Sequence, residues 1–100
     1  MYKICVFAGT TEGRELVEFL SSQPAQVTAC VATEYGSKSL TEGEFLHVTA
    51  KRLSVDEMET LLRDVKPELV LDATHPYAVE VTQNIFEACN RTDTEYQRVL

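Results

Sequence analysis

The chain has 100 residues, with 9 Lys and Arg against 16 Asp and Glu, a formal net charge of −7 and 44% hydrophobic residues. This length and composition predict one globular domain with a single core, because domains typically contain about 100–150 residues. The negative charge argues against nucleic acid and anionic membranes as partners, since both are bound by clustered Lys and Arg. No apolar run reaches the ~20 residues of a membrane span, and the N-terminal run lacks a signal-peptide cleavage site, so a cytoplasmic protein is expected.

Cysteine and histidine are spread through the sequence without a metal-binding pattern. Cys5, Cys30 and Cys89 lie in apolar runs, which is typical of buried, reduced thiols in a cytosolic protein. His47 and His75 are far apart in the chain, and no CxxC is present. We therefore expect no metal site.

Segments typical of strands and helices alternate from one end of the sequence to the other. Short apolar or β-branched runs predict strands over 2–8, 26–32, 45–49, 68–73 and 96–100. Apolar residues at helical spacing predict a first helix over 12–21. A second helix opens with the capping box of Ser54 and Glu57 and ends at Pro67, and a third has Pro76 in its first turn.

Strands joined by crossover helices predict a parallel sheet with right-handed connections. The expected fold class is α/β, a Rossmann-like doubly wound sheet of about five strands in the order 3-2-1-4-5, arranged as three αβα layers. No repeat, linker or low-complexity tract divides the sequence, so residues 1–100 are predicted to form a single dinucleotide-binding domain. Ligands of such sheets bind at the carboxyl ends of the strands, beside the crevice where strands 1 and 4 diverge.

The turn after the first strand is the first candidate site. Small residues lead into a helix N-terminus, whose free N–H groups and positive dipole favour pyrophosphate. The segment departs from GxGxxG, because Ala8 and Thr10 occupy the first two glycine positions and only Gly13 matches the third. A tight connection without a ligand is the alternative interpretation. The candidate cofactor-binding residues here are Gly9, Thr10, Thr11, Glu12 and Gly13.

The loop after the second strand is where dinucleotide-binding folds contact the ribose. Glu34 is placed to accept the 2′-OH of NAD, whereas Ser37, Lys38 and Ser39 are placed to contact the 2′-phosphate of NADP. A solvated polar loop is the alternative for each of these residues.

The segment after the fourth strand is the second candidate site. Asp72 ends a buried strand and is followed by Ala73, Thr74, His75, Pro76 and Tyr77. A histidine titrates near neutral pH, so His75 can transfer a proton to a ligand, or it can cap the next helix. The alternative is that Asp72 and Thr74 only cap that helix.

The two segments together resemble the precorrin-6A reductase family. The matching stretches are Gly9 to Arg14, Tyr35-Gly36 and, most specifically, Asp72-Ala73-Thr74-His75-Pro76-Tyr77-Ala78. Thr82, Asn84-Ile85, Cys89, Tyr96 and Arg98 extend the resemblance over essentially the whole chain.

The resemblance implies reduction of a double bond in precorrin-6A or cobalt-precorrin-6A to the 6B form, in corrin-ring (cobalamin) biosynthesis. NADPH or NADH is the expected cofactor, and a tetrapyrrole is the expected substrate. Family members carry a second α/β domain, so the chain is expected to be an N-terminal half, either truncated or completed by a partner chain. On the matching positions, residues 9–13 hold the cofactor phosphates, with Asp72 and Ala73 beside the cofactor. Thr74, His75 and Tyr77 lie near the nicotinamide and macrocycle as catalytic candidates, His75 as proton donor.

A non-catalytic nucleotide- or phosphate-binding α/β module is the competing hypothesis. A receiver-like signalling domain fits poorly, because no carboxylate ends the first or third strand. The anionic ligands that the resemblance implies need a local excess of positive charge on this acidic chain. Five cations follow predicted strand ends and are expected on the binding rim: Arg14, Lys38, Lys51, Arg52 and Arg98.

Overall fold

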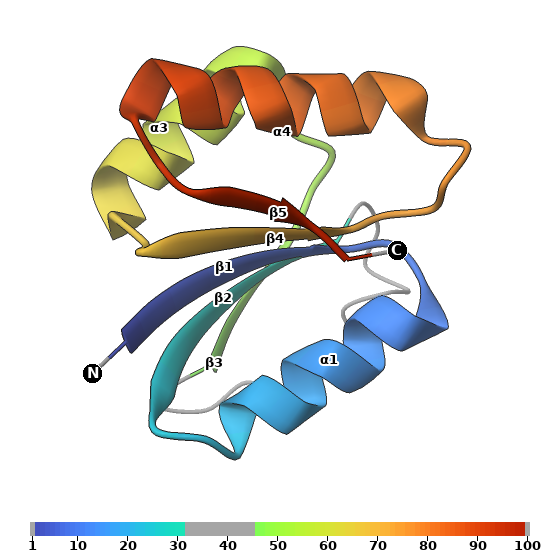
Figure 1. The fold of residues 1–100 in the computed structure, drawn as a ribbon, viewed down its shortest axis with the longest axis vertical. Helices are drawn as coiled ribbons and strands as arrows, with labels where there is room; N and C mark the ends of the chain where they lie inside the picture. The colour runs from blue at the N-terminus through green and yellow to red at the C-terminus, as the bar shows by residue number, and fades with distance from the viewer. Residues whose placement is uncertain (1, 32–45, 100) are drawn as a thin grey trace.

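The computed structural model describes residues 2–31 and 46–99, which form a five-stranded parallel sheet (Figure 1). The strands are β1 (Tyr2–Ala8), β2 (Ala25–Val31), β3 (Leu46–Ala50), β4 (Leu69–Ala73) and β5 (Tyr96–Arg98). Their order is β3-β2-β1-β4-β5, and every neighbouring pair is parallel. The predicted fold class and strand order are confirmed.

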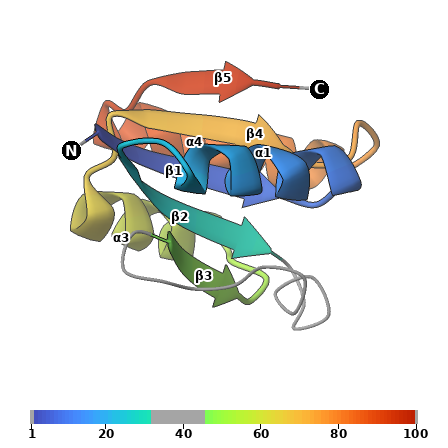
Figure 2. The same cartoon turned by 90° about the horizontal axis from the view of Figure 1, so that it is seen from below.

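Helices cover both faces of this sheet. Helix α1 (Thr11–Ser21) lies across one face, and α3 (Val55–Val65) and α4 (Val79–Thr92) lie side by side on the other (Figures 1 and 2). The central strand β1 is buried on both sides, and its side chains alternate between two cores. Val6 belongs to the core beneath α1, whereas Cys5 and Phe7 belong to the core beneath α3 and α4.

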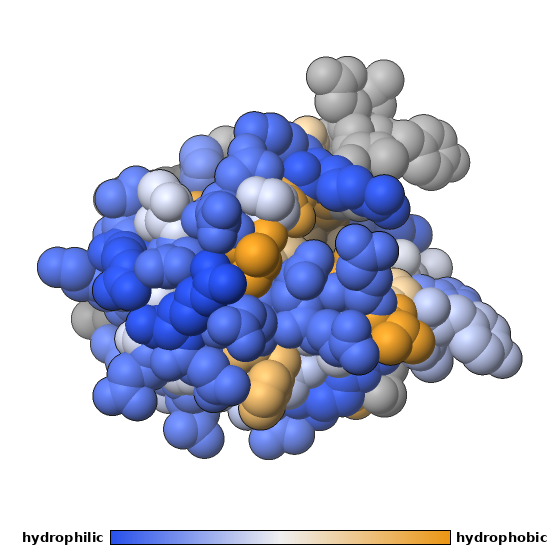
Figure 3. Space-filling view, turned by 90° about the horizontal axis from the view of Figure 1, so that it is seen from above, coloured by the Kyte–Doolittle hydropathy of each residue, from blue (hydrophilic) through white to orange (hydrophobic). Residues whose placement is uncertain are grey.

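The outer surface of α3 and α4 is mainly hydrophilic (Figure 3). Arg91 of α4 pairs with Asp56 at 2.9 Å and with Glu59 at 3.2 Å, both on α3. Arg63 of α3 pairs with Glu59 at 2.9 Å and donates to the Arg91 carbonyl at 3.1 Å. These contacts join the two helices on their solvent-facing side. On the side that faces the sheet, both helices pack into the core through Met58, Leu62, Ile85 and Ala88.

The capping box predicted for α3 is present. The Ser54 hydroxyl accepts from the Glu57 amide at 3.2 Å, and the Glu57 carboxylate accepts from the Ser54 amide at 2.9 Å. The helix ends at Lys66, whose φ of 53° places it in the left-handed region just before Pro67.

The predicted start of α4 at Pro76 is wrong. The helix begins at Val79, and Ala78 is its N-cap without a side-chain hydrogen bond. Pro76 instead occupies a turn that is closed by the Ala78 amide donating to the His75 carbonyl at 2.9 Å. The second position of a turn suits the fixed φ of proline. The prediction that His75 caps the helix, and the alternative that Asp72 and Thr74 do, are therefore also wrong.

The three cysteines lie buried in the core and form no disulfide, as predicted. Within residues 2–31 and 46–99, no helix has the length and apolar character needed to cross a membrane. The same residues include no group of three or more His, Cys, Asp or Glu side chains that could hold a metal ion.

Candidate functional site

The two candidate segments meet at the carboxyl edge of the sheet, where β1 and β4 lie side by side. The Ala73 carbonyl at the end of β4 accepts from the Gly9 amide at 3.4 Å and from the Thr10 hydroxyl at 3.2 Å. Segments more than sixty residues apart in the chain are thus joined through one backbone oxygen. The two segments therefore meet at the ends of strands 1 and 4, where the sequence predicts a ligand-binding crevice.

The Thr10 side chain is the N-cap of α1. Its hydroxyl oxygen accepts from the Gly13 amide at 3.0 Å, and its hydroxyl proton is donated to the Ala73 carbonyl. Both hydrogen bonds of the hydroxyl are therefore made to other residues of the protein. No described residue accepts from the amides of Thr11 or Glu12, and both residues are exposed. Two free N–H groups at the positive end of a helix are a ready anion site. The Arg14 guanidinium adds positive charge there, since it donates to the Thr11 hydroxyl at 3.3 Å.

The two glycines of the turn differ in what the structure requires of them. A Cβ on Gly13 would lie 3.0 Å from the Ala73 carbonyl oxygen and 3.2 Å from the Ala8 Cα. Only glycine therefore lets α1 cross so close to β1 and β4, which is the role of the third glycine of a dinucleotide-binding turn. A Cβ on Gly9 would meet only ordinary contacts, the nearest at 3.6 Å from the Thr74 Cα. Gly9 leaves space at the rim without being needed for packing.

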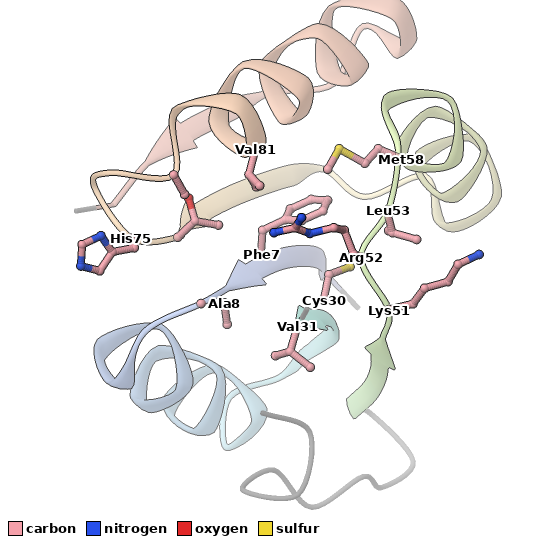
Figure 4. Close-up of a pocket in the computed structure, with 13 residues that line it drawn as sticks. Phe7, Ala8, Cys30, Val31, Lys51, Arg52, Leu53, Met58, His75 and Val81 are labelled. Atoms are coloured by element: carbon pink, nitrogen blue, oxygen red, sulfur yellow. The ribbon is translucent and has the colours of Figure 1, made fainter. Parts of the chain in front are cut away.

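A hollow of about 190 Å³ opens beside this turn, on the face of the sheet that α3 and α4 cover (Figure 4). Its wall runs from the end of β1 across the ends of β2 and β3 to the start of α4. Most of the lining is apolar and includes Phe7, Cys30, Leu53, Met58 and Val81. Gly9, Thr74 and His75 border it on the side of the β1–α1 turn.

Two consecutive cations after β3 take different directions at the rim of this hollow. Arg52 extends its guanidinium into the hollow toward Phe7, whereas Lys51 points away from it (Figure 4). The Lys51 ammonium pairs with Glu57. That contact, followed by the backbone hydrogen bond from Ser54, lowers the pKa of Glu57 to about 2. Lys51 is therefore neutralised by its partner, and Arg52 supplies the positive charge of the hollow.

Asp72 lies at the centre of a buried hydrogen-bond network behind the edge. Its side chain has 0% exposure, and both carboxylate oxygens accept several hydrogen bonds. One oxygen accepts from the Thr74 hydroxyl at 2.6 Å and the Arg98 guanidinium at 2.8 Å. The other accepts from the Tyr96 hydroxyl at 2.8 Å and the Thr82 hydroxyl at 2.9 Å. The network ties β4, β5 and α4 together.

This network keeps Asp72 ionised. Burial raises the pKa of Asp72, but the hydrogen bonds from Thr74, Tyr96 and Thr82 outweigh burial and leave the pKa below its ordinary value. Burial, followed by the hydrogen bond to Asp72, raises the pKa of Tyr96 to about 12. Arg98, predicted on the binding rim, neutralises Asp72 and also donates to the Thr74 carbonyl at 2.8 Å.

His75 and Tyr77 lie in the exposed part of the second segment, on either side of Pro76. The Tyr77 amide donates to His75 Nδ1 at 3.1 Å, and the two ring centroids are 5.0 Å apart. Because Nδ1 accepts a hydrogen bond, the neutral imidazole carries its proton on Nε2. Tyr77 is 87% exposed, so its phenol is open to a ligand.

The structure brings together Gly9, Thr10, Gly13, Ala73 and Thr74 through contacts between the two segments. Asp72 lies beneath the surface and does not line the hollow, and the Thr74 hydroxyl is bonded to it. Glu34, Ser37 and Lys38 lie outside the described residues. Cofactor contact and catalysis by the predicted residues stay predictions. Sequence reasoning missed the apolar hollow, because its lining residues follow the same apolar pattern as the core.

A parallel 3-2-1-4-5 sheet with a free helix N-terminus beside its switch point defines a Rossmann-like α/β protein. Comparison with protein-family models identifies the family of the chain. The model described as precorrin-6x reductase CbiJ/CobK matches residues 3–100, and the chain belongs to this family. The resemblance inferred from the sequence motifs is confirmed.

The curated relatives that the chain matches are named cobalt-precorrin-6A reductase. The chain is 34% identical over 96 residues to the cobalt-precorrin-6A reductase of Methanothermobacter thermautotrophicus, covering 95% of the chain and 32% of that protein. It is 33% identical over 98 residues to the cobalt-precorrin-6A reductase of Salmonella typhimurium, covering 95% of the chain and 37% of the relative. The chain thus spans about a third of the length of these relatives.

Solved structures agree on the fold. The structure of the CobK precorrin-6A reductase superposes with a TM-score of 0.81 at 25% identity, covering 98% of this chain and 38% of that one. The Bordetella bronchiseptica enzyme WbmH, solved in complex with NAD⁺, superposes with a TM-score of 0.71 at 15% identity, covering 94% and 36%. At that identity the second match supports the fold alone.

Proposed function

We propose that this chain is the cofactor-binding part of a reductase that uses NADPH or NADH to reduce one double bond of precorrin-6A or cobalt-precorrin-6A to the 6B form, in corrin-ring biosynthesis. Family membership and the names of the relatives support the reaction class. The observation that carries the assignment to this chain is the β1–α1 turn. It presents the free Thr11 and Glu12 amides beside Gly13, where the helix approaches the sheet most closely.

The residues of the turn fit a dinucleotide through their backbone. The amides of Thr11 and Glu12 would donate to the pyrophosphate, and the missing side chain of Gly9 would let it approach. Thr10 would hold the turn against Ala73 rather than contact the phosphate, because its hydroxyl is already bonded on both sides. Arg14 would add charge at the same place. The Glu12 carboxylate would remain in solvent. Its negative charge stabilises the helix through the positive end of the helix dipole.

When bound, the nicotinamide cofactor would supply the hydride. The chain would orient the cofactor and the substrate relative to each other. Asp72, bound by Thr74 and Arg98, fixes the start of the 74–78 segment, and that segment carries His75 to the rim of the hollow. The Nε2–H of His75 would then donate a hydrogen bond to the substrate, and the exposed Tyr77 ring would meet the flat face of the tetrapyrrole. A second domain, or a partner chain that carries it, would cover the macrocycle.

Direct titration tests the cofactor assignment. NADPH and NADH are added to the chain, and cofactor fluorescence and amide chemical shifts are followed; the chain has no Trp to interfere. We expect saturable binding of at least one cofactor, with the largest shifts at Gly9, Thr11 and Glu12. Absence of binding of both cofactors at millimolar concentration overturns the assignment.

A variant pair locates the binding. Gly9→Ala adds a Cβ at the rim where only ordinary contacts exist, so the fold is kept while the approach of the phosphates is hindered. We expect at least a tenfold loss of affinity, on the order of 1.4 kcal/mol. Gln26→Val, at an exposed strand position near the opposite edge, is the control and should bind as the parent chain does. Equal affinities in the three proteins would place the phosphates elsewhere.

A further inference from the structure

The guanidinium of Arg98 holds the residue that directly precedes His75. Arg98 ends the edge strand β5, next to the end of β4. Its Nη2 donates to the Thr74 carbonyl at 2.8 Å, and its Nη1 donates to the Thr74 hydroxyl at 3.0 Å and to the Asp72 carboxylate at 2.8 Å. One side chain from a neighbouring strand therefore fixes both the backbone and the side chain of Thr74.

These contacts use the shape of the guanidinium as well as its charge. Two nitrogens of one rigid plane bond to two different groups of Thr74 at the same time. A lysine ammonium is a single point charge, so it can pair with Asp72 without holding the Thr74 carbonyl and hydroxyl together. The ion pair and the hold on Thr74 can therefore be separated by substitution.

The residues after Thr74 have little else to fix them. In the part of the chain that the structure describes, residues 75–77 form hydrogen bonds only within the segment that ends at Ala78. The Tyr77 amide donates to His75 Nδ1 at 3.1 Å, and the Ala78 amide donates to the His75 carbonyl at 2.9 Å. All three residues are exposed. The place of His75 therefore depends on how firmly Thr74 is held before it and on the start of α4 after it.

The other members of the buried network do not make this contact. Thr82 and Tyr96 donate to the second carboxylate oxygen of Asp72, at 2.9 Å and 2.8 Å. Among the described residues, Arg98 alone donates to the Thr74 carbonyl. Arg98 is therefore the member of the network that connects the buried carboxylate to the backbone in front of His75.

We propose that Arg98 is a positioning residue of the reductase site, which sets the place of His75 at the rim of the hollow through its two hydrogen bonds to Thr74. The inference rests on the proposed function, in which His75 donates a hydrogen bond to the substrate. Arg98 acts in this arrangement through Thr74, while its charge neutralises Asp72.

Backbone relaxation tests the hold on Thr74. Order parameters of the backbone amides are measured by ¹⁵N NMR for the parent chain, Arg98→Lys and Arg98→Gln. Arg91→Lys is the control, because Arg91 forms ion pairs on the outer surface of α3 and α4. We expect values near about 0.85, typical of rigid backbone, at Thr74 and His75 in the parent chain and the control. In Arg98→Lys they should fall below about 0.6 at His75 and Tyr77.

The His75 ring gives a readout that a loss of global stability does not move. Spectra of the ring nitrogens are recorded near about pH 8, where histidine is neutral. In the parent chain, Nδ1 accepts from the Tyr77 amide, so the shifts should be those of the Nε2–H tautomer. In Arg98→Lys this hydrogen bond should be lost, and the shifts of Nδ1 and Nε2 should move toward those of a free imidazole. His47 is the only other histidine and serves as the reference in the same spectra.

The outcomes separate this inference from the proposed function. Arg98→Lys keeps a cation beside Asp72, so we expect it to fold even where Arg98→Gln leaves the carboxylate unpaired and does not. Unchanged order parameters at 75 and 77, unchanged His75 ring shifts, or equal changes in Arg91→Lys overturn the positioning role. Titration of the parent chain with NADPH and NADH is the separate measurement: failure of both to bind overturns the proposed function, while the hold of Arg98 on Thr74 is decided by the relaxation data.

Discussion

The two segments that meet at the carboxyl edge use their polar groups in opposite ways. In the β1–α1 turn, the side chain of Thr10 is turned inward, and the backbone amides of Thr11 and Glu12 face outward. In the segment at the end of β4, Asp72 and Thr74 are buried in a network, and only the residues after Thr74 are exposed. Polar residues at a strand end are therefore not equivalent: some shape the site, and others are available to a ligand.

Removal of Asp72 should have the largest effect on stability. Asp72→Ala leaves Arg98, Tyr96 and the hydroxyls around them without their buried acceptor. Breaking a buried ion pair by removing one partner costs about 3–5 kcal/mol, and we expect a loss of that size in urea unfolding. Asp64→Ala, at an exposed position, should change stability by less than ~0.5 kcal/mol. Similar losses in the two variants would show that the network does not stabilise the fold.

The two glycines sharpen the comparison within the turn. Gly13→Ala forces a Cβ against the Ala73 carbonyl and the Ala8 backbone, and we expect a destabilisation of about 1–3 kcal/mol. Gly9→Ala meets no close contact and should change stability by less than ~0.5 kcal/mol. Both are measured by thermal and urea unfolding. A Gly13→Ala variant as stable as the parent chain would contradict the close approach of α1 to β1 and β4.

The neighbouring threonines form a third matched pair. Thr10→Ala removes the N-cap of α1 and should cost about 1 kcal/mol, while Thr10→Ser keeps the hydroxyl and most of the stability. Thr11→Ala should leave stability within ~0.5 kcal/mol, because the Thr11 side chain is exposed. Chemical unfolding distinguishes the four proteins. A larger loss in Thr11→Ala than in Thr10→Ala would reverse the roles assigned to the two side chains.

The smallest expected effect is the response of the network to mild acid. The folded-state pKa of Asp72 is lowered, so its stabilisation is present above the unfolded pKa and is lost as pH falls through the folded pKa. With an ordinary Asp pKa of about 3.9 in the unfolded chain, the loss is only ~0.1 kcal/mol at pH 4.5 and grows below pH 4. The carboxyl ¹³C signal of Asp72 reports this titration directly. A midpoint at or above the ordinary value would contradict the network.

Much of the fold follows from the sequence because its signals are local. The apolar run of β1 predicts a strand buried on both faces, and the capping box of Ser54 and Glu57 marks the start of α3 to the residue. The start of α4 was misplaced because Pro76 suits a turn as well as a first helical turn.

The site is less predictable because its roles depend on contacts distant in the chain. Asp72 binds partners from β5 and α4, so its burial in a network has no signal in its own segment. Lys51 and Arg52 are adjacent and alike in charge, yet Glu57 forms an ion pair with Lys51 and not with Arg52. The two directions depend on where the start of α3 places Glu57, and no motif at positions 51 and 52 indicates this.

The shared carbonyl of Ala73 has a consequence for motion at this edge. Because Gly9 and Thr10 both donate to it, the turn cannot separate from β4 without losing two hydrogen bonds at once. The turn and the central strands should therefore open as one cooperative unit. In hydrogen–deuterium exchange, the Gly9 amide should exchange slowly for so exposed a residue, at a rate closer to that of β4 than to that of the 75–78 turn.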